Sequence, residues 1–406
     1  MPVGLQAFRG KRLREARLAR GLYMNALGDM LGITGTAISR YEEDTDKPQH
    51  DRLVAIAKHL NFPIEFFLQP EWPERPDVVH WRSRSAETKY AREMTEQRMI
   101  WLCEVFSYLE RDVNFPQLKL PDLQLPDFRA LTAAKIENAA ESVREHWKLR
   151  ELPIPDACLA LENAGIPVVN LEITSEKQDG FCFFSKVLER PFVGINSQNM
   201  SAARARYDVA HELGHAVLHR AITPQQLRDP SLNKLIEQQA HRFAGAFLFP
   251  QEAFRFEVLS PTLDYFCALK KRWGMSIAAM IYRAYDLGMI DDQERSILYR
   301  NLARRGWRGP LQEPFDNPSD MPIERPRMLR RGIGVVLDQG TSRSAMKAAL
   351  ALPEREIEQL AGLDRGFFTP AEVHQLATPK RRLPLRALDV ESGQVIEFSR
   401  SQKKGD

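Results

Sequence analysis

The sequence predicts a mainly helical protein with a small β-sheet, an α+β fold. Apolar residues recur at helical spacing over most of the chain, whereas two short runs rich in phenylalanine and valine, Phe181–Phe184 and Phe192–Ile195, are typical of strands. The chain has 406 residues, of which 43% are hydrophobic and 27% charged. This length and composition predict two to four globular domains, each with a buried core.

Charge, cysteines and hydropathy narrow the class of protein. The formal net charge is only +3, so any binding of nucleic acid must depend on a local surface. Four scattered cysteines without a CxxC pair argue against a disulfide framework or a cysteine-ligated zinc site. The chain begins without a secretory signal, and no apolar run approaches the roughly 18 residues of a membrane span. We therefore expect a cytoplasmic protein with no membrane partner.

Two proline-rich stretches, at 114–128 and 310–326, suggest where domains begin and end. They predict four parts. Residues 1–69 form a small helical domain, and residues 70–128 form a helical and proline-rich connector. Residues 129–309 form a mixed domain with helices on both sides of the predicted strands. Residues 310–406 form a C-terminal helical accessory region.

The first part has the pattern of a helix-turn-helix. Its apolar residues can converge on one small core: Leu13, Leu27, Leu31, Ile38, Leu53, Ile56 and Leu60. Gly21 and Gly32 lie where two helices must end in tight turns. The helix after Gly32 begins near Thr34 and buries Ile38. The small polar and basic side chains that a groove-reading helix needs then point outward, namely Thr34, Thr36, Ser39 and Arg40.

This region resembles the XRE, or phage-repressor-like, helix-turn-helix family over about 60 residues. The matching stretches are Arg12–Arg17, Leu31–Thr34, Ala37–Glu42, Lys47-Pro48 and Asn61–Phe67. The family usually begins its second helix with Thr or Ser and then Gln, whereas this chain has Tyr23-Met24. The resemblance implies a five-helix domain that binds double-stranded DNA and, by analogy with many relatives, a homodimer. A domain used only for docking another protein remains the alternative.

The mixed domain contains the motif His211-Glu212-Leu213-Gly214-His215, an HExxH sequence. Two histidines four residues apart share one face of a helix and can bind one zinc ion. Zinc polarises a peptide carbonyl and acidifies water, and the carboxylate of Glu212 beside the metal can act as the catalytic base. This chemistry requires the observed spacing.

A third ligand is needed, and three residues compete for the role. His219 is nearest in the sequence, but the eight residues from His211 to His219 span about 12 Å of helix, too far for one ion. We therefore expect His219 to be structural or to support a ligand. Glu237 and His241 lie four apart on the next helix, and either can complete the site.

Residues 130–309 resemble the ImmA/IrrE family of zinc metallopeptidases. The matching stretches are Arg206–His215, Glu237–Pro250, Asp179–Phe181 and Arg190–Asn196. The resemblance implies a zincin-like domain in which His211, His215 and Glu237 bind zinc and Glu212 is the base. His241 stands where many relatives have Asn or Asp, so it is either a bystander or a donor to the transition state.

The family suggests that the substrate is a protein or peptide, in particular a repressor. Self-cleavage within the connector at 70–128, which we expect to be accessible, is a further option. The competing hypothesis is a transcription regulator or antitoxin-like protein without proteolysis, in which the zinc domain acts as a sensor. A peptidase that uses its helical N-terminus only for protein docking is a third hypothesis.

Overall fold

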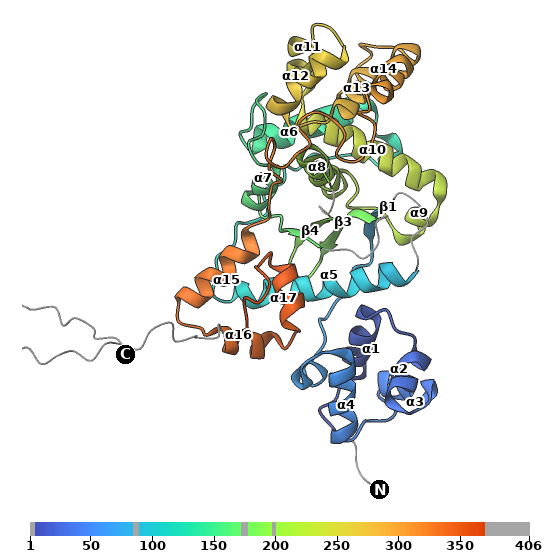
Figure 1. Ribbon diagram of the computed structural model, residues 1–406, viewed down its shortest axis with the longest axis vertical. Helices are drawn as coiled ribbons and strands as arrows, with labels where there is room; N and C mark the ends of the chain where they lie inside the picture. The colour runs from blue at the N-terminus through green and yellow to red at the C-terminus, as the bar shows by residue number, and fades with distance from the viewer. Residues whose placement is uncertain (1–4, 84–88, 172–177, 197–199, 370–406) are drawn as a thin grey trace, which may run out of the picture. The chain divides into compact units, whose positions relative to one another are not determined.

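The structure, a computed structural model, describes residues 5–83, 89–171, 178–196 and 200–369. The described residues up to Phe368 form one compact unit (Figure 1). The predicted fold class, mainly α with a small sheet, is confirmed: the described elements are helices apart from four strands. The part of the predicted accessory region from 370 to 406 lies outside the described residues. Among the helices described, none is both long and apolar enough to cross a membrane.

Four α-helices and a short 3₁₀ helix make up the N-terminal domain: α1 (Gly10–Ala19), α2 (Met24–Leu31), α3 (Gly35–Glu42), α4 (His50–Leu60) and η1 (Ile64–Phe67). The fifth predicted helix is thus reduced to one 3₁₀ turn, because Pro63 and the packing of Phe66 and Phe67 leave it only four residues. All seven apolar residues of the predicted core are buried. Arg17 joins α1 to α3 by donating from Nε and Nη2 to both carboxylate oxygens of Glu42, at 2.5 and 2.8 Å.

The sheet has four strands in the order β1-β3-β4-β2: β1 (Val79–Ser83), β2 (Val168–Asn170), β3 (Gln178–Ser185) and β4 (Arg190–Ile195). β3 runs antiparallel to both β1 and β4, and β2 runs parallel to β4. The two strands predicted at Phe181–Phe184 and Phe192–Ile195 are present as β3 and β4. β1 was not predicted, because it lies in the segment interpreted as a connector.

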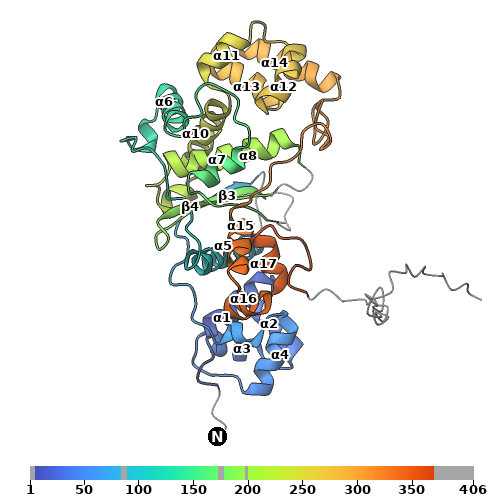
Figure 2. The ribbon, with the colours of Figure 1, turned by 90° about the vertical axis from the view of Figure 1, so that its left-hand side faces the viewer.

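Alternate residues of the strands face two different cores, as the period of two of a β-strand requires. Cys182 and Val193 point into a core shared with α8 (Ala202–Leu218), whereas Phe181, Phe183 and Phe192 point into a second core shared with α5 (Lys89–Glu110). Figures 1 and 2 both show α8 on one side of the sheet and α5 on the other. The second core continues into the helix-turn-helix domain.

The remaining helices complete the two cores. Those of the first core are α6 (Ala133–His146), α7 (Ala157–Asn163), α9 (Pro224–Arg228), α10 (Pro230–Leu248), α11 (Gln251–Glu257), α12 (Leu263–Trp273), α13 (Ile277–Asp286) and α14 (Asp292–Arg304). A short 3₁₀ helix, η2 (Phe128–Ala130), precedes α6. α15 (Met328–Asp338), α16 (Arg343–Leu350) and α17 (Glu354–Leu360) pack against α5. α10 lies alongside both α8 and α6.

The segment 70–128 differs from the accessible connector expected from the sequence. Met99, Trp101, Leu102 and Phe106 of α5 are fully buried, because α5 is the central helix of the second core. The side chains of Val79 and His80 on β1, an edge strand of the sheet, are buried as well. Among the described residues of this segment, the stretches at 70–78 and 111–127 are exposed or half-buried throughout. Of the described residues in this segment, these two stretches are the ones accessible to cleavage in the folded chain.

Candidate metal centre and DNA-facing helix

α8 carries the HExxH motif in the middle of a buried helix. The hydroxyl of Ser201 caps its first turn by accepting a hydrogen bond from the Arg204 backbone at 3.3 Å. Apolar residues around the helix, such as Val209 and Leu213, are buried in the first core. His211 and Glu212 are 0% exposed and His215 only 1%. The motif is therefore positioned by packing from all sides.

α10 lies close to α8 because small residues meet at the crossing. A Cβ atom at Gly214 would approach the Cα atom and carbonyl oxygen of Ala240 to 3.2 Å. A larger side chain at 214 would push the helices apart. Asp229 caps α10 through its carboxylate, and Pro230 occupies the first turn. Glu237 and His241, one turn apart on α10, thereby face the histidines of α8.

Two imidazole nitrogens and the two oxygens of one carboxylate converge between the two helices. The Nε2 atoms of His211 and His215 lie 3.1 Å apart. The carboxylate oxygens of Glu237 lie 3.2 Å from Nε2 of His211 and 3.4 Å from Nε2 of His215. A tetrahedral zinc ion with bonds of 2.0–2.1 Å requires its ligand atoms to be about 3.3 Å apart. These distances fit that requirement, and the nitrogen and carboxylate donors suit zinc.

The arrangement also affects the pKa of Glu237. Burial works to raise its pKa, but hydrogen bonds and charge from His211 and His215 outweigh burial and hold the pKa well below its usual range. Its side chain is 25% exposed, in contrast to the two histidines. The centre therefore opens to solvent on the side of α10 rather than through α8.

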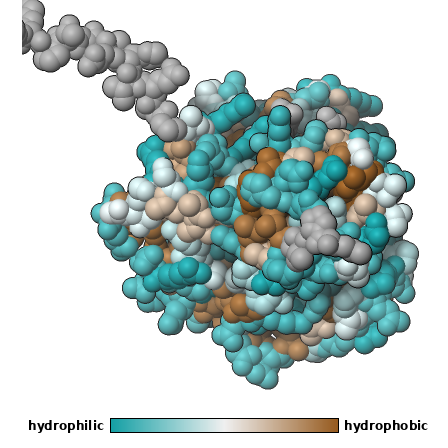
Figure 3. Space-filling view, turned by 90° about the horizontal axis from the view of Figure 1, so that it is seen from below, coloured by the Kyte–Doolittle hydropathy of each residue, from teal (hydrophilic) through white to brown (hydrophobic). Residues whose placement is uncertain are grey.

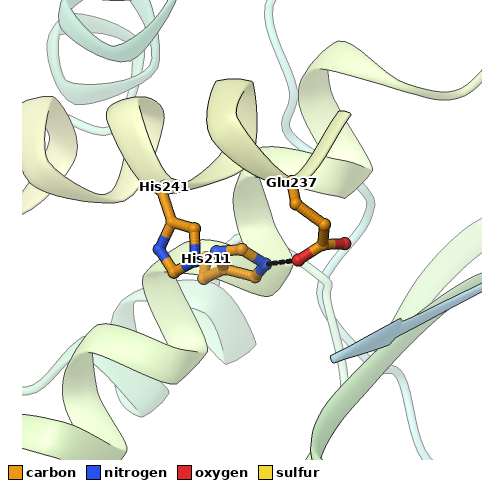
Figure 4. A group of neighbouring side chains, drawn as sticks. All are labelled: His211, Glu237 and His241. Carbon is orange, nitrogen blue, oxygen red and sulfur yellow. Dashed lines mark ion pairs between the residues drawn. The ribbon is translucent and has the colours of Figure 1, made fainter. Parts of the chain in front are cut away.

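His241 lies next to this centre. Figure 4 shows its imidazole beside that of His211, on the opposite side of His211 from Glu237. The two ring centroids are 4.5 Å apart, and one nitrogen of His241 lies within 4.8 Å of ligand atoms of His211 and Glu237. Tyr207 anchors the segment by donating from its hydroxyl to the His241 carbonyl oxygen at 2.9 Å. His241 is half-buried, so it borders the open side of the centre.

Glu212 lies on the side of α8 that faces the sheet. Its carboxylate lies against Gly180 of β3, where an added Cβ would be 2.9 Å from Oε1 of Glu212. The glycine leaves room for this carboxylate. Cys182, two residues along β3, is fully buried, and burial together with the charge of Glu212 raises the pKa of its thiol well above normal. Glu212 is therefore a fully buried carboxylate enclosed between α8 and β3, and its role as a base stays a prediction.

His219 does not join the converging atoms of His211, His215 and Glu237. Its Nδ1 lies 3.0 Å from Nδ1 of His215, and its Nε2 lies 3.0 Å from Oε1 of Gln239 on α10. Burial, with a smaller contribution from His215, lowers the pKa of His219 to about 3. His219 is thus buried between His215 and Gln239, and the prediction that it is structural or supports a ligand stays a prediction.

The sequence reasoning missed His80. The ring of His80, on β1, stacks on that of His215 with centroids 4.3 Å apart and planes at 12°. Burial, followed by the charges of His215 and His219, lowers the pKa of His80 well below normal. A signal existed: Val78-Val79 and Trp81 flank His80 in a short β-prone run after Pro76. The run was overlooked because it lies outside the mixed domain.

The predicted DNA-facing residues lie on or next to α3. Gly32 ends α2 with φ +65°, and Thr34 caps α3 by accepting a hydrogen bond from the Ala37 backbone at 3.2 Å. Thr34, Thr36 and Arg40 are exposed, whereas Ser39 is half-buried and donates to Glu43 at 2.9 Å. Figure 3 views the molecule from the end with these helices and shows mostly hydrophilic residues, interrupted by smaller hydrophobic patches.

Together these features define a helix-turn-helix regulator domain joined to a domain of metallopeptidase type. Comparison with known families gives both parts a name. Residues 13–67 match the helix-turn-helix family, and residues 161–285 match the IrrE N-terminal-like domain of peptidase family M78. The chain therefore combines an XRE-type helix-turn-helix domain with an IrrE/ImmA-like domain.

Several curated proteins are similar to part of the chain. The HTH-type transcriptional regulator PuuR of Escherichia coli K12 is 38% identical over 71 residues, which is 17% of this chain and 38% of PuuR. An uncharacterized HTH-type regulator of Sinorhizobium medicae is 38% identical over 60 residues, 15% of this chain and 43% of that protein. YobD of Bacillus subtilis, another uncharacterized HTH-type regulator, is 29% identical over 85 residues, 18% of this chain and 75% of YobD. The chain thus spans about two fifths of the first two relatives.

Proposed function

We propose that this protein is a DNA-binding transcriptional regulator whose second domain is a zinc-dependent endopeptidase that cleaves a regulatory protein, such as a repressor. The observation that carries the proposal is the convergence of Nε2 of His211, Nε2 of His215 and the Glu237 carboxylate within 3.1–3.4 Å of one another. The proposed division into domains is that predicted from the sequence, with 1–69 for DNA and 129–309 for catalysis.

In this proposal His211, His215 and Glu237 hold the zinc ion, which supplies Lewis acidity toward a peptide carbonyl. Glu212 accepts the proton of the attacking water on a carboxylate oxygen and delivers it to the departing amide nitrogen. Its burial excludes bulk water from this step. His241, beside His211 on the open side of the centre, donates a hydrogen bond to the negative charge that develops on the carbonyl oxygen.

A protein substrate suits the way the centre opens. The side bordered by Glu237 and His241 is partly exposed, whereas the histidines of α8 are buried. An extended segment of a protein can approach from that side. The helix-turn-helix domain in the same chain supports a substrate found near DNA, because binding to an operator would raise the local concentration of the peptidase around DNA-bound repressors.

The peptidase proposal is tested with purified protein and its Glu212→Gln variant. Zinc content and zinc affinity are measured first, and both proteins are then incubated with the repressors encoded beside its gene. We expect about one zinc per chain in both proteins. We expect cleavage by the wild type alone, with the variant slower by about 10²-fold or more. Equal cleavage by both proteins, or wild-type protein that binds no zinc, contradicts the proposal.

The helix-turn-helix domain implies DNA binding, and we propose that Thr34, Thr36, Ser39 and Arg40 form the contact surface. The test measures binding to the protein's own promoter at two salt concentrations. Arg40→Ala should weaken binding and reduce the salt dependence by about one counterion if Arg40 contacts phosphate. Arg228→Ala removes an exposed arginine from α9 and is the matched control. Equal effects of the two substitutions would argue against this surface.

The regulator is proposed to act as a homodimer, because two-fold related half-sites are the usual targets of helix-turn-helix domains. Sedimentation of the protein with and without its operator tests this point. A monomer that binds one half-site with full affinity would contradict it.

A sensor without proteolysis is the second candidate function, and the position of His241 favours it. A fourth protein donor close to the centre can close a zinc site, and closed sites are structural rather than catalytic. X-ray absorption of the zinc-loaded protein counts the histidine ligands. Three histidines, together with normal regulation in cells by the Glu212→Gln variant, would support the sensor. Two histidines and loss of regulation support the peptidase.

A further inference from the structure

We propose that the carbonyl oxygen of Phe128 fixes which ring nitrogen of neutral His215 carries the hydrogen. It does so through a relay of hydrogen bonds that passes along two buried side chains, Gln239 and His219. The relay makes these two side chains positioning residues for the centre. The inference rests on the proposed zinc site, and it concerns how the chain prepares one ligand for the metal rather than which residues bind it.

The relay begins at a backbone carbonyl group. The Phe128 carbonyl, on η2, can only accept a hydrogen bond. The nitrogen of the Gln239 side-chain amide lies 2.6 Å from it, so the amide must turn its NH₂ group toward Phe128. The other end of the amide, Oε1, therefore faces His219 and can only accept. This orientation follows from the backbone carbonyl and does not depend on how amide atoms are assigned.

The direction of each further hydrogen bond follows in turn. Nε2 of His219 lies 3.0 Å from Oε1 of Gln239, so Nε2 carries the hydrogen. In a neutral imidazole the other nitrogen is then an acceptor. Nδ1 of His219 faces Nδ1 of His215 at 3.0 Å, so His215 must donate from Nδ1. This leaves the lone pair of the neutral His215 ring on Nε2.

That lone pair points at the converging atoms. Nε2 of His215 lies 3.1 Å from Nε2 of His211 and 3.4 Å from the Glu237 carboxylate. A metal needs the unprotonated nitrogen, and the partner of the other ring nitrogen decides which nitrogen that is. Without the relay, His215 would divide between two tautomers, and one of them carries a hydrogen at the position that the metal must occupy.

Burial makes the relay effective. Gln239 is 3% exposed and His219 is 1% exposed, so water does not compete for their hydrogen bonds. The relay joins η2, α10 and α8, and its anchor at Phe128 lies before the matched IrrE N-terminal-like range of 161–285. The segment that precedes the matched domain therefore contributes to the proposed metal site.

The first test reads the tautomer directly, by ¹⁵N nuclear magnetic resonance of the imidazoles in metal-free protein. The proposal expects His219 to be neutral with its hydrogen on Nε2 at pH 7.5. A hydrogen on Nδ1 of His219 would reverse the direction of the relay and overturn the proposal. This measurement needs neither zinc nor a substrate, so it remains informative if the proposed enzymatic function fails.

The second test measures zinc affinity by competition with a chelating dye. Gln239→Leu keeps the size of the side chain but removes both hydrogen bonds, and we expect affinity to fall by about 10–100-fold. Gln238→Leu makes the same chemical change on the exposed neighbouring position and should leave affinity unchanged. Wild-type affinity in a folded Gln239→Leu protein would overturn the relay. Failure of the wild type to bind zinc would instead overturn the proposed metal site.

A second pair of variants distinguishes the loss of a hydrogen-bond acceptor at position 219 from a change in packing. The Oδ1 atom of an asparagine can take the place of the histidine Nδ1, so His219→Asn restores an acceptor for His215. His219→Leu fills the space without an acceptor. The relay predicts that His219→Asn stays within a few-fold of wild-type zinc affinity, whereas His219→Leu loses about 10–100-fold. Equal losses in the two variants, with both proteins folded, would show a role in packing alone and would overturn the proposal.

Discussion

The imidazole of His80 lies parallel to that of His215, with ring centroids 4.3 Å apart. His80 belongs to β1, which pairs with β3 through Val79–Ser83, while His215 belongs to the HExxH helix. The strand that follows the helix-turn-helix domain therefore supplies one wall of the proposed metal centre. Because β1 lies outside the matched range of 161–285, the wall is contributed by the part of the chain that links the two domains.

Substitution of His80 tests this wall. His80→Ala leaves a cavity against His215, and we expect the free energy of unfolding to fall by about 2–3 kcal/mol. His80→Phe restores the stack and removes the buried Nδ1, which has no hydrogen-bond partner among the described residues, but it also removes the hydrogen bond of the ring to the His219 backbone, so it should recover part of the loss. Urea unfolding measures both variants, with His146→Ala on the exposed face of α6 as control. Equal stability of the Ala and Phe variants would show that the stack contributes nothing.

Gly180 gives a second prediction, because its missing side chain makes room for Glu212. In Gly180→Ala the new Cβ would lie 2.9 Å from Oε1 of Glu212 and 3.0 Å from the Gly194 carbonyl oxygen. We expect a loss of about 1–3 kcal/mol in stability and, under the proposed function, a fall in cleavage rate of about tenfold or more with zinc retained. Thermal unfolding, zinc titration and cleavage kinetics measure these effects.

Gly334→Ala is the matched control for this substitution. Gly334 lies in α15, and a Cβ atom there would meet nothing within 4 Å. Alanine should therefore be neutral or stabilising by up to about 1 kcal/mol, as expected for a helix interior. If Gly180→Ala behaved like Gly334→Ala in all three measurements, the carboxylate of Glu212 would not depend on the space at Gly180.

The part of the proposed centre that lies on α8 could be predicted because its residues are close together in the sequence. His211, Glu212 and His215 share one helix, so their spacing alone predicts that they lie together. Glu237 is different, because spacing made Glu237 and His241 equally good candidates for the third ligand. Only the family resemblance favoured Glu237. The structure places Glu237 against both histidines of the motif, and the ring of His241 beside that of His211.

The parts that escaped prediction depend on contacts between distant segments. His80 and Phe128 reach the centre from β1 and η2, and nothing in their local sequence indicates which helix they meet. The same reason explains the misinterpreted connector. The apolar spacing of α5 predicted a helix correctly, but the burial of its apolar side chains follows from the sheet, α15 and α17, which pack around it from later in the chain.

Acid should destabilise the metal-free protein through His219. Its pKa is about 3 in the folded state and near 6.5 when unfolded. Above pH 6.5 both states leave the ring neutral. Between pH 6.5 and 3 only the unfolded state binds the proton, so stability falls as the pH falls, by about 1.4 kcal/mol per unit. His80, whose pKa is also lowered, adds to the effect in the same direction.

Urea unfolding at pH 7.5 and pH 5.0 measures this dependence. His219→Asn has no titrating ring, so it should lose about 2 kcal/mol less than the wild type between the two pH values. An equal loss in the two proteins would mean that His219 does not resist protonation in the folded state. The comparison uses metal-free protein, because zinc would add its own dependence on pH.

Glu356 provides the last prediction, which concerns how the helix-turn-helix domain is held. Its carboxylate accepts from Arg20, just after α1, at 2.7 Å and from Arg98 of α5 at 3.1 Å. The carboxylate is 7% exposed, so Glu356→Ala leaves two partly buried guanidinium groups without their shared partner. We expect a loss of about 2–4 kcal/mol and faster hydrogen exchange at the end of α1.

An exposed ion pair provides the control for Glu356→Ala. Asp264 accepts from Arg305 at 2.5 Å, but its side chain is 78% exposed, so Asp264→Ala should leave the free energy of unfolding close to that of the wild type. The two substitutions remove the same kind of group and differ in burial and in the number of partners. If they cost the same, Glu356 would be an ordinary surface residue. If only Glu356→Ala loosens α1, then α17 fixes the DNA-binding domain to the helix on which the sheet of the proposed metal centre rests, since α5 packs on that sheet.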